Sequence, residues 1–218
     1  MKKIISTILI FMTFGAAFAR EITVKVKPGQ HWKEKREPQI ALWLEDRDGN
    51  YLRTLYVTQR AGHKSWIFGP KEGRPESLPV WYGASKNGST ASKAEASPSA
   101  ESEPSLTRSL DAVTGATPKS ELSLTTQIEE LDYIIKAEFN NSFDYNDFYT
   151  KKNSGVNGQP SVVYSSKIPA NLTAGQEITL DFAGTGSLTG QDGAISKNTE
   201  GLTSAVEIVK NISLTIKE

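Results

Sequence analysis

The feature that most constrains the fold is a two-residue alternation of apolar and polar side chains. In residues 21–27 (EITVKVK) it places Ile22, Val24 and Val26 on one face. Successive side chains of a strand point to opposite faces, so this pattern predicts strands and not helices. Similar segments of strand length lie at 39–45, 51–58, 131–140, 160–168, 177–184 and 211–217. Short strands separated by Gly, Asn and Pro turns predict an all-β fold, an immunoglobulin-like antiparallel β-sandwich.

Residues 46–50 (DRDGN) lie between two of these strands. The pairs Asp48-Gly49 and Gly49-Asn50 favour positive φ, which predicts a β-hairpin. The segment also begins like a calcium-binding loop. However, Tyr51 stands where the sharp-turn glycine belongs and Val57 where the bidentate Glu belongs. We therefore expect a turn and no metal site.

Two segments differ from the strands. Residues 201–211 (GLTSAVEIVKN) have apolar side chains at helical spacing, which predicts one short helix. Residues 84–105 are dominated by Ser, Ala, Glu, Lys and Pro and contain no large apolar side chain. Such a stretch buries too little apolar area to offset its loss of conformational entropy. We expect a long disordered insertion, a low-complexity loop within one domain.

The N-terminus resembles a secretory signal peptide. Lys2 and Lys3 precede an apolar run of about 15 residues, which ends in the small-residue pattern AAFA at 16–19. The alternative, a transmembrane anchor, needs about 20 apolar residues. No cysteine follows the run, which excludes a lipid-anchored lipoprotein. We expect cleavage near Ala19, a periplasmic or secreted location, and a single mature domain over residues 20–218.

Composition then excludes several kinds of chemistry. The chain has 25 basic and 25 acidic residues, and removal of residues 1–19 takes away two lysines, which leaves a net charge of −2. Such a balance argues against nucleic-acid binding. The mature chain has neither Cys nor Met, so it has no disulfide, thiolate ligand or thiol nucleophile. It also has no second apolar run long enough to span a membrane.

No catalytic residue set is visible. The only histidines are His31 and His63, and no serine stands in a Gly-x-Ser-x-Gly motif. Walker and dinucleotide-binding fingerprints are missing as well. We therefore expect no histidine-rich metal site and no catalytic activity belonging to the chain itself.

An acidic and aromatic run occupies residues 140–149 (NNSFDYNDFY), directly after a predicted strand. Its rings and carboxylates have the chemistry to stack on a flat ligand and hydrogen-bond its edge. The alternative is that the rings close one end of the sandwich while Asp and Asn form Asx turns. Turn formation alone accounts for these residue types, so we favour it.

The most distinctive short motif is DAVTGAT at residues 111–117. It resembles the Asp-x-x-(Ser/Thr)-Gly-Ala-(Ser/Thr) signature at which exported bacterial flavoproteins receive FMN from FAD through a flavin transferase. The resemblance implies that Thr117 is joined to the FMN phosphate. The other motif residues that it implies for cofactor attachment are Asp111, Thr114, Gly115 and Ala116. The alternative is a Gly-containing surface turn.

Several longer segments resemble a family of predicted bacterial periplasmic proteins, domain of unknown function family 2271. They are PQIALWLEDRDGNYLRTLYVT (38–58), RPESLPVW (74–81), DAVTGATPKS (111–120), FNNSFDYNDFYT (139–150), NGQPSVVYSSKI (157–168) and GLTSAVEIVKNISLTIK (201–217). The resemblance implies an exported, β-rich protein associated with extracytoplasmic flavin redox systems.

Two functions from different classes follow. In the first, the protein is an electron carrier with covalent FMN on Thr117, loaded by a flavin transferase and serving membrane redox proteins. The aromatic side chains considered for packing on the flavin are Trp66, Trp81, Tyr145 and Tyr149. In the second, the protein is a non-catalytic binding or accessory module of such redox systems, and its turns recognise a partner protein.

Overall fold

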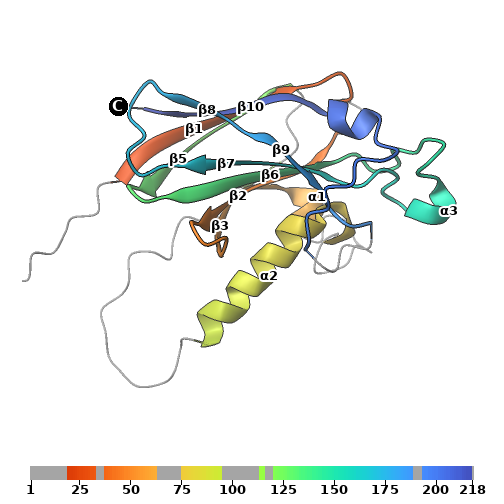
Figure 1. Cartoon of the computed structure of the whole chain (residues 1–218), viewed down its shortest axis with the longest axis horizontal. Coiled ribbons are helices and arrows are strands. Elements are labelled where there is room, and N and C mark those ends of the chain that lie inside the picture. Colours follow the sequence, from red (N-terminus) through yellow and green to blue (C-terminus); the bar gives the residue numbers. More distant parts are fainter. Residues whose placement is uncertain are drawn as a thin grey trace, which may run out of the picture.

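Two stacked sheets make up the protein, in a computed structural model that describes residues 19–32, 37–62, 75–94, 113–115, 120–188 and 193–217 (Figure 1). The four-stranded sheet has the order β5-β1-β10-β8, and the six-stranded sheet has the order β4-β3-β2-β6-β7-β9. All pairs of neighbouring strands are antiparallel except β3 and β4, which are parallel. The predicted antiparallel β-sandwich is confirmed.

The strands match most of the predicted segments. The four-stranded sheet contains β1 (Ala19–Pro28), β5 (Leu122–Glu129), β8 (Glu177–Thr179) and β10 (Val209–Ile216). The six-stranded sheet contains β2 (Gln39–Asp46), β3 (Tyr51–Thr58), β4 (Val113–Gly115), β6 (Tyr133–Asn140), β7 (Val162–Ile168) and β9 (Asp181–Thr185). The sequence patterns did not predict β4 or β5.

The main core lies between the two sheets and follows the predicted alternation. Ile22, Val24 and Val26 of β1 are fully buried there. The facing sheet contributes Ile40 and Leu42 from β2. Further fully buried members are Ile135, Ala137, Phe139, Val162, Ile168 and Leu214. Apolar side chains at every second position therefore meet in one layer, which is the stabilisation that a cysteine-free sandwich depends on.

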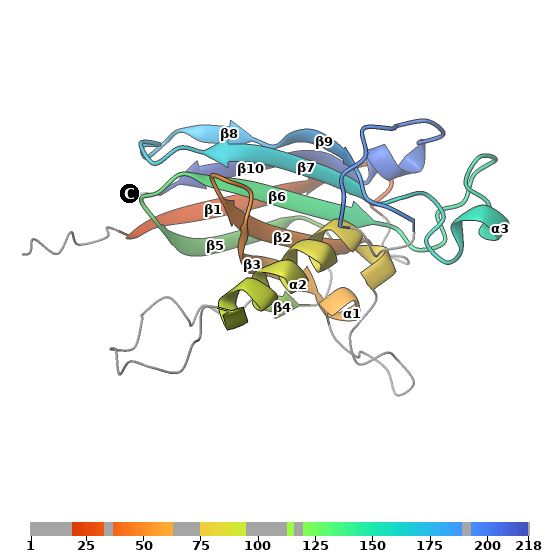
Figure 2. The same cartoon turned by 60° about the horizontal axis from the view of Figure 1, so that its bottom comes forward.

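A third layer covers the outer face of the six-stranded sheet. It is formed by α1 (Gln59–Gly62), the 3-10 helix η1 (Pro75–Ser77) and α2 (Pro79–Ala94), and Figure 2 shows α2 lying obliquely under β2 and β3. A second apolar cluster fills this interface; its buried members are Ala41, Trp43, Val57, Ala61, Leu78, Val80 and Val163. The central part of the six-stranded sheet is thus buried on both faces.

The predicted hairpin between β2 and β3 is confirmed. Asp46 Oδ1 accepts hydrogen bonds from the backbone N–H groups of Asp48 at 2.9 Å and Asn50 at 2.8 Å. Gly49 has φ of 88°, the left-handed conformation that favours glycine. The hydrogen bonds, led by the one from the Asn50 side chain, lower the pKa of Asp46. The Asp46 carboxylate is therefore used to close the turn.

The segment 177–184 forms two strands and not the single one predicted. β8 pairs with β10 in the four-stranded sheet, whereas β9 pairs with β7 in the other sheet. Between them, the buried Leu180 donates its backbone N–H to the carbonyl of Ile212 at 3.0 Å. The chain therefore crosses between the sheets at Leu180, although its apolar alternation continues without a break.

The predicted helix over 201–211 is wrong. Residues Ser204–Glu207 form only a short 3-10 helix, η2, and β10 begins at Val209. Val206, Ile208 and Val209 are β-branched, which weakens helix formation and favours a strand where a neighbouring strand is available. That neighbour is β1, which pairs with β10.

The low-complexity loop predicted over 84–105 is wrong for its first part. Residues up to Ala94 belong to α2, whereas residues 95–105 lie outside the described part of the chain. The difference arises because Val80 and Trp81, at the start of α2, pack on the sheet and supply a stable first turn. Once a helix is nucleated, each further residue adds a hydrogen bond at low cost.

The predicted signal peptide falls almost entirely outside the described residues, because β1 is the first described element and begins at Ala19. The sandwich is thus built from residues that follow the expected cleavage site, with the single addition of Ala19. Within the described part of the chain, no helix combines the length and apolar character needed to cross a membrane.

Arg20 fixes the beginning of β1. Its side chain is buried, with 7% exposed, and its hydrogen-bond partners among the described residues include no carboxylate. The guanidinium instead donates to four backbone carbonyls, those of Leu131 (3.3 Å), Pro169 (3.1 Å), Ala170 (2.9 Å) and Leu172 (3.3 Å). Arg20 therefore joins β1 to the turn between β5 and β6 and to the loop that follows β7.

We expect Arg20→Met to lower the free energy of unfolding by about 2–3 kcal/mol, because the four part-buried hydrogen bonds from the guanidinium to backbone carbonyls are lost. Urea unfolding of the mature chain measures the change. The matched control is Lys25→Met, an exposed position on the same strand, which should change stability by less than about 0.5 kcal/mol. Equal effects of the two substitutions would contradict the role assigned to Arg20.

Candidate functional site

The centre of the DAVTGAT motif forms β4, the last strand of the six-stranded sheet. In the parallel register, Val113, Thr114 and Gly115 lie opposite Tyr56, Val57 and Thr58. The other motif residues, Asp111, Ala112, Ala116 and Thr117, lie outside the described residues. What the structure places is therefore the backbone of the three central motif residues, at a sheet edge.

The strand beside the motif is held firmly. The Thr58 hydroxyl is buried, donates to Gln39 Oε1 at 3.0 Å and accepts the backbone N–H of Ile40 at 3.2 Å. Burial, together with the negative charge of Glu37, raises the pKa of Tyr56 to about 12. The Tyr56 phenol is thus protonated at physiological pH, and it cannot act as a general base next to β4.

Glu138 of β6 holds the N-terminus of α2. Its fully buried carboxylate accepts the backbone N–H groups of Val80 at 3.2 Å and Trp81 at 2.8 Å, and the Ser161 hydroxyl at 2.6 Å. Those two amides belong to the first helical turn, where no intrahelical partner exists. Pro79 opens the helix and has no N–H to satisfy. A side chain from the sheet therefore performs the capping of α2.

The Glu138–Ser161 pair has the groups of a base and a nucleophile, but its surroundings exclude catalysis by it. Glu138 is 0% exposed and Ser161 2% exposed, so no substrate reaches either side chain. A Cβ added to Gly186 would lie 2.4 Å from Ser161 Oγ and 3.0 Å from Glu138 Oε1, which shows how closely the backbone encloses the pair. We assign Glu138 a structural role.

A second polar group lies under α2 on β3. The Trp81 indole N–H donates to Thr54 Oγ1 at 2.8 Å, and the hydroxyls of Tyr51 and Thr54 are 2.6 Å apart. The Tyr51 ring occupies the space where a Cβ on Gly88 would fall, 2.5 Å from Tyr51 Cδ1. Trp81 is thus fixed by a directional bond, and its ring is only partly buried.

A buried ion pair between Glu45 and Lys136 lies on the same face of the sheet, and the indole of Trp43 donates a hydrogen bond to its carboxylate. Trp43 Nε1 donates to Glu45 Oε1 at 2.8 Å, and Lys136 Nζ lies 2.7 Å from Glu45 Oε2. The Glu45 side chain is 3% exposed and that of Lys136 20%. The carboxylate is therefore neutralised where it is buried, as such a charge requires.

The three described aromatic residues that were considered for a flavin site, Trp81, Tyr145 and Tyr149, do not gather around one point. Trp81 bonds to Thr54 under α2, whereas Tyr145 donates to the carbonyl of Gly155 at 2.7 Å and Tyr149 to that of Glu200 at 3.0 Å. Trp66 lies outside the described residues. The two tyrosines thus belong to the connection between β6 and β7. Tyr145 bonds within that connection, and Tyr149 contacts the turn before η2.

Asx turns organise the acidic and aromatic run. Asn146 Oδ1 accepts the backbone N–H groups of Phe148 at 3.0 Å and Tyr149 at 2.7 Å. Just after the run, Asn153 in the one-turn helix α3 (Lys151–Ser154) accepts the N–H of Thr150 at 2.7 Å, which is a capping box and not an Asx turn. The turn interpretation of this segment is confirmed at Asn146.

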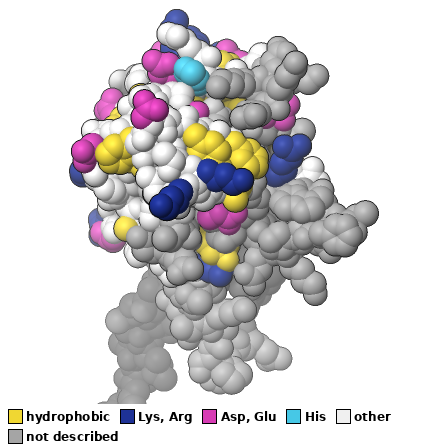
Figure 3. All heavy atoms as spheres, turned by 90° about the vertical axis from the view of Figure 1, so that its right-hand side faces the viewer, with side chains coloured by type: hydrophobic (Ala, Val, Ile, Leu, Met, Phe, Trp, Pro, Cys, Tyr) yellow, Lys and Arg dark blue, Asp and Glu magenta, His cyan; other side chains and the backbone are white. Residues whose placement is uncertain are grey.

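The same connection carries exposed apolar rings. Phe143 is 49% exposed and Phe148 46% exposed, and Val156 beside them is 45% exposed. Phe143 also has φ of 62°, the only positive φ at a non-glycine residue in the described chain. Figure 3 looks onto this end of the sandwich and shows hydrophobic side chains beside charged ones. Neither the exposure nor the conformation of Phe143 favours folding.

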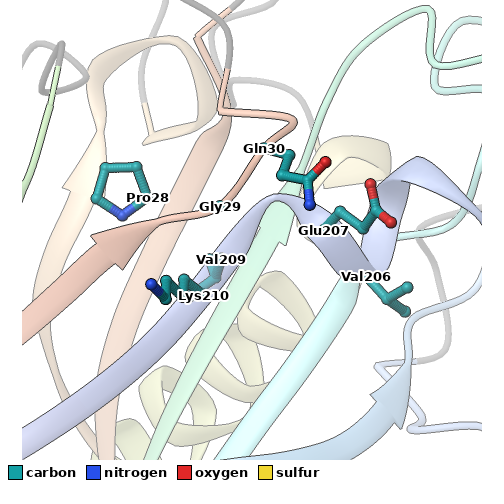
Figure 4. Close-up of a pocket in the computed structure, with 7 residues that line it drawn as sticks. All are labelled: Pro28, Gly29, Gln30, Val206, Glu207, Val209 and Lys210. Carbon is teal, nitrogen blue, oxygen red and sulfur yellow. The ribbon is translucent and has the colours of Figure 1, made fainter.

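A groove of about 490 Å³ opens elsewhere, between the end of β1 and η2 (Figure 4). Its lining residues are Pro28, Gly29, Gln30, Val206, Glu207, Val209 and Lys210. Glu207 is already paired with His31, with 3.1 Å between His31 Nε2 and Glu207 Oε2. No sequence-predicted site residue lines this groove, so it is separate from both the motif and the aromatic run.

Within the described residues, no three acidic or histidine side chains come together in an arrangement that could hold a metal ion. Comparison of the chain with family models, curated proteins and solved structures found no match. Functional conclusions therefore depend on the motif and on the geometry of the sandwich.

Glu138 provides a pH-dependent test of this geometry. Burial raises the pKa of Glu138 to about 7. The hydrogen bonds that it accepts from Ser161, Trp81 and Val80 lower the pKa, but by less than burial raises it. A carboxyl with a raised pKa in the folded state stabilises the fold below its unfolded pKa and loses that contribution as pH rises through 7. Between pH 4 and pH 8 the loss amounts to about 3 kcal/mol.

We therefore expect Glu138→Gln to remove this loss of unfolding free energy at high pH. The difference in unfolding free energy between wild type and variant should then change by about 3 kcal/mol from low to high pH. Urea unfolding across that pH range measures it. Glu177→Gln, at an exposed position of β8, is the control and should leave the pH profile unchanged. A profile for Glu138→Gln that runs parallel to that of the wild type contradicts the assignment.

The conformation of Phe143 gives a second test. Asn tolerates positive φ better than Ala, so Phe143→Asn should be more stable than Phe143→Ala by about 0.5–1 kcal/mol, both having lost the ring. Thermal unfolding measures the difference. At Phe148, where φ is not positive, Asn should give no such advantage over Ala. The same Asn-over-Ala advantage at both positions argues against strain at Phe143.

Proposed function

We propose that the protein is an exported electron carrier that holds FMN covalently on Thr117. The observation that carries the proposal is the DAVTGAT motif together with the position of its centre in β4, at the edge of the six-stranded sheet. A modification segment has to enter the cleft of another enzyme. A sheet edge allows such an approach, whereas the interior of a sheet does not.

In the proposed modification, the hydroxyl oxygen of Thr117 forms a bond to the phosphorus of the FMN half of FAD. The pyrophosphate bond breaks, AMP leaves, and a base of the transferase takes the hydroxyl proton. No oxidation or reduction occurs in this step. The attached isoalloxazine then accepts and donates electrons, and the chain needs no acid–base pair for that role.

The proposal agrees with what the described residues offer. The carboxylate of Glu138 and the hydroxyl of Ser161 are closed to solvent, so this pair supplies no competing chemistry. Membership in the flavin-associated periplasmic family that the sequence resembles, export through the predicted signal peptide, and contact with membrane redox proteins are parts of the same proposal. In this proposal the sandwich positions the flavin, and the flavin carries out the electron transfer.

A second function, that of a non-catalytic binding module, is favoured by a different observation. Phe143 and Phe148 remain half exposed on a segment whose backbone is fixed by Asn146. Rigid, exposed aromatic side chains are typical of recognition surfaces, because little conformational entropy is lost on binding. This function is compatible with flavin attachment, since the segment lies away from β4.

The test of the first function is co-expression of the protein with a flavin transferase, followed by intact-protein mass spectrometry. We expect an FMN-sized mass increase and flavin absorbance, both lost in Thr117→Ala. Ser120→Ala, at an exposed hydroxyl three residues further on, is the matched control and should keep the flavin. An unmodified wild-type chain, made with a transferase that flavinylates a known substrate, overturns the proposal.

A further inference from the structure

The groove between the end of β1 and η2 exposes apolar surface to solvent. Val206 is 40% exposed and Pro28 is half-buried, and Val209 belongs to the same lining. The volume of about 490 Å³ falls within the range of small-molecule sites, roughly 300–1,000 Å³. Apolar surface in a concave site is removed from water when an apolar ligand covers it, which lowers the free energy. The lining therefore favours a ligand with an apolar body.

Backbone contacts fix the walls of this groove before any ligand binds. The Gly29 N–H donates to the carbonyl of Ile208 at 2.8 Å, and the His31 N–H donates to the carbonyl of Glu207 at 3.0 Å. A Cβ added to Gly29 would overlap the carbonyl oxygen of Glu207, so only glycine lets the end of β1 approach η2 this closely. The groove is therefore preformed, and little conformational entropy is lost when a ligand fills it.

A β-bulge brings Lys210 into the lining. In the ladder between β1 and β10, Lys27 lies opposite Asn211, whereas the next residue, Pro28, lies opposite Val209. Lys210 is therefore an extra residue on β10. Neighbouring side chains of a regular strand point to opposite faces, yet Val209 and Lys210 both line the groove. The bulge thus places an ammonium group beside an apolar surface.

The charges on the two sides of the groove differ. Lys210 is exposed, as is Lys27 directly before Pro28, and no carboxylate of the described residues lies within ion-pair distance of either lysine. Figure 4 shows Glu207 on the opposite side from Lys210, and Glu207 is the residue that pairs with His31. One side therefore attracts an anionic group, whereas the other side repels a second one.

We propose that this groove binds a small apolar monocarboxylate. The carboxylate of the ligand lies at Lys210, and its apolar chain covers Val209 and Val206. Glu207 restricts the ligand to one carboxylate, because a second one at the far end of the chain would lie next to a negative charge. Binding is non-covalent. The site is separate from the flavinylation-like motif, since no residue of 111–117 lines the groove.

Octanoate is the probe, and octanamide, which has a similar shape and no charge, is the matched ligand control. NMR titration of the wild-type mature chain with octanoate should shift the amide signals of Gly29, Gln30 and residues 206–210. We expect a Kd on the order of 1 mM, as for a ligand of this size. Octanamide should bind about fivefold more weakly, because it forms no ion pair with Lys210.

Two pairs of variants locate the binding site. Lys210→Met should bind both ligands without a preference for octanoate, whereas Lys25→Met, exposed on β1 outside the groove, should keep the preference. Val206→Trp should weaken the binding of both ligands by about tenfold, because the larger side chain fills the groove. Val156→Trp, at a valine of similar exposure on the connection between β6 and β7, should bind like the wild type.

Octanedioate tests the role of Glu207. It should bind the wild type about fivefold more weakly than octanoate does, because its second carboxylate meets Glu207. Glu207→Gln should remove this difference. Glu177→Gln, at an exposed position of β8, is the control and should keep it.

Failure of octanoate to shift the groove signals, equal wild-type affinities for octanoate and octanamide, or a Lys210→Met chain that keeps the preference overturns the proposal. A Val206→Trp chain that binds octanoate like the wild type overturns it as well, and so does equal wild-type binding of octanedioate and octanoate. Tighter binding of a short apolar peptide with a free carboxyl terminus would assign the groove to a peptide instead. None of these outcomes depends on flavin attachment to Thr117.

Discussion

Burial of the central part of the six-stranded sheet on both faces is the constraint on which the rest of the structure depends. One face meets the four-stranded sheet, and the other meets α1, η1 and α2. In many antiparallel sheets one face is solvated and can carry charges freely. Here Glu45, Lys136 and Glu138 are covered, and each has a partner close by. Each buried charged side chain on this face therefore has a defined partner, just as each apolar side chain of the core has defined neighbours.

The sequence alone predicted the structure correctly where the structure follows from the local pattern of residues. Alternation placed Ile22, Val24 and Val26 correctly, and the Asp48-Gly49 pair identified the hairpin. The sequence did not predict the elements whose structure depends on tertiary contacts. Helix α2 contains Gly and Ser and few apolar residues, and its stability comes from a distant carboxylate and from contacts with β3. Nothing in the alternation of 177–184 marks the crossing at Leu180, because Ile178, Leu180 and Phe182 continue one apolar pattern, although Leu180 is buried and Phe182 is 40% exposed.

For the candidate site too, the sequence predicted some features and only the structure shows others. The flavinylation-like motif is recognisable in the sequence, yet only the structure places its centre beside Thr58 at the end of β3. Arg20 could not have been identified from the sequence, since its partners are backbone carbonyls from residues 131–172. The exposed rings of Phe143 and Phe148 were noticed as a run, whereas their exposure and the positive φ at Phe143 are properties of the folded loop.

On the proposed export route, the position of Ala19 and Arg20 within β1 sets the order of leader cleavage and folding. Ala19 lies opposite Glu129 and Arg20 opposite Ile128 in the ladder with β5. A peptidase acts on an extended chain that is free of other pairing, and a strand inside a sheet does not offer one. A leader that is cut after Ala19 therefore has to be removed before β1 joins β5. Completion of the sandwich limits the time available for that cleavage.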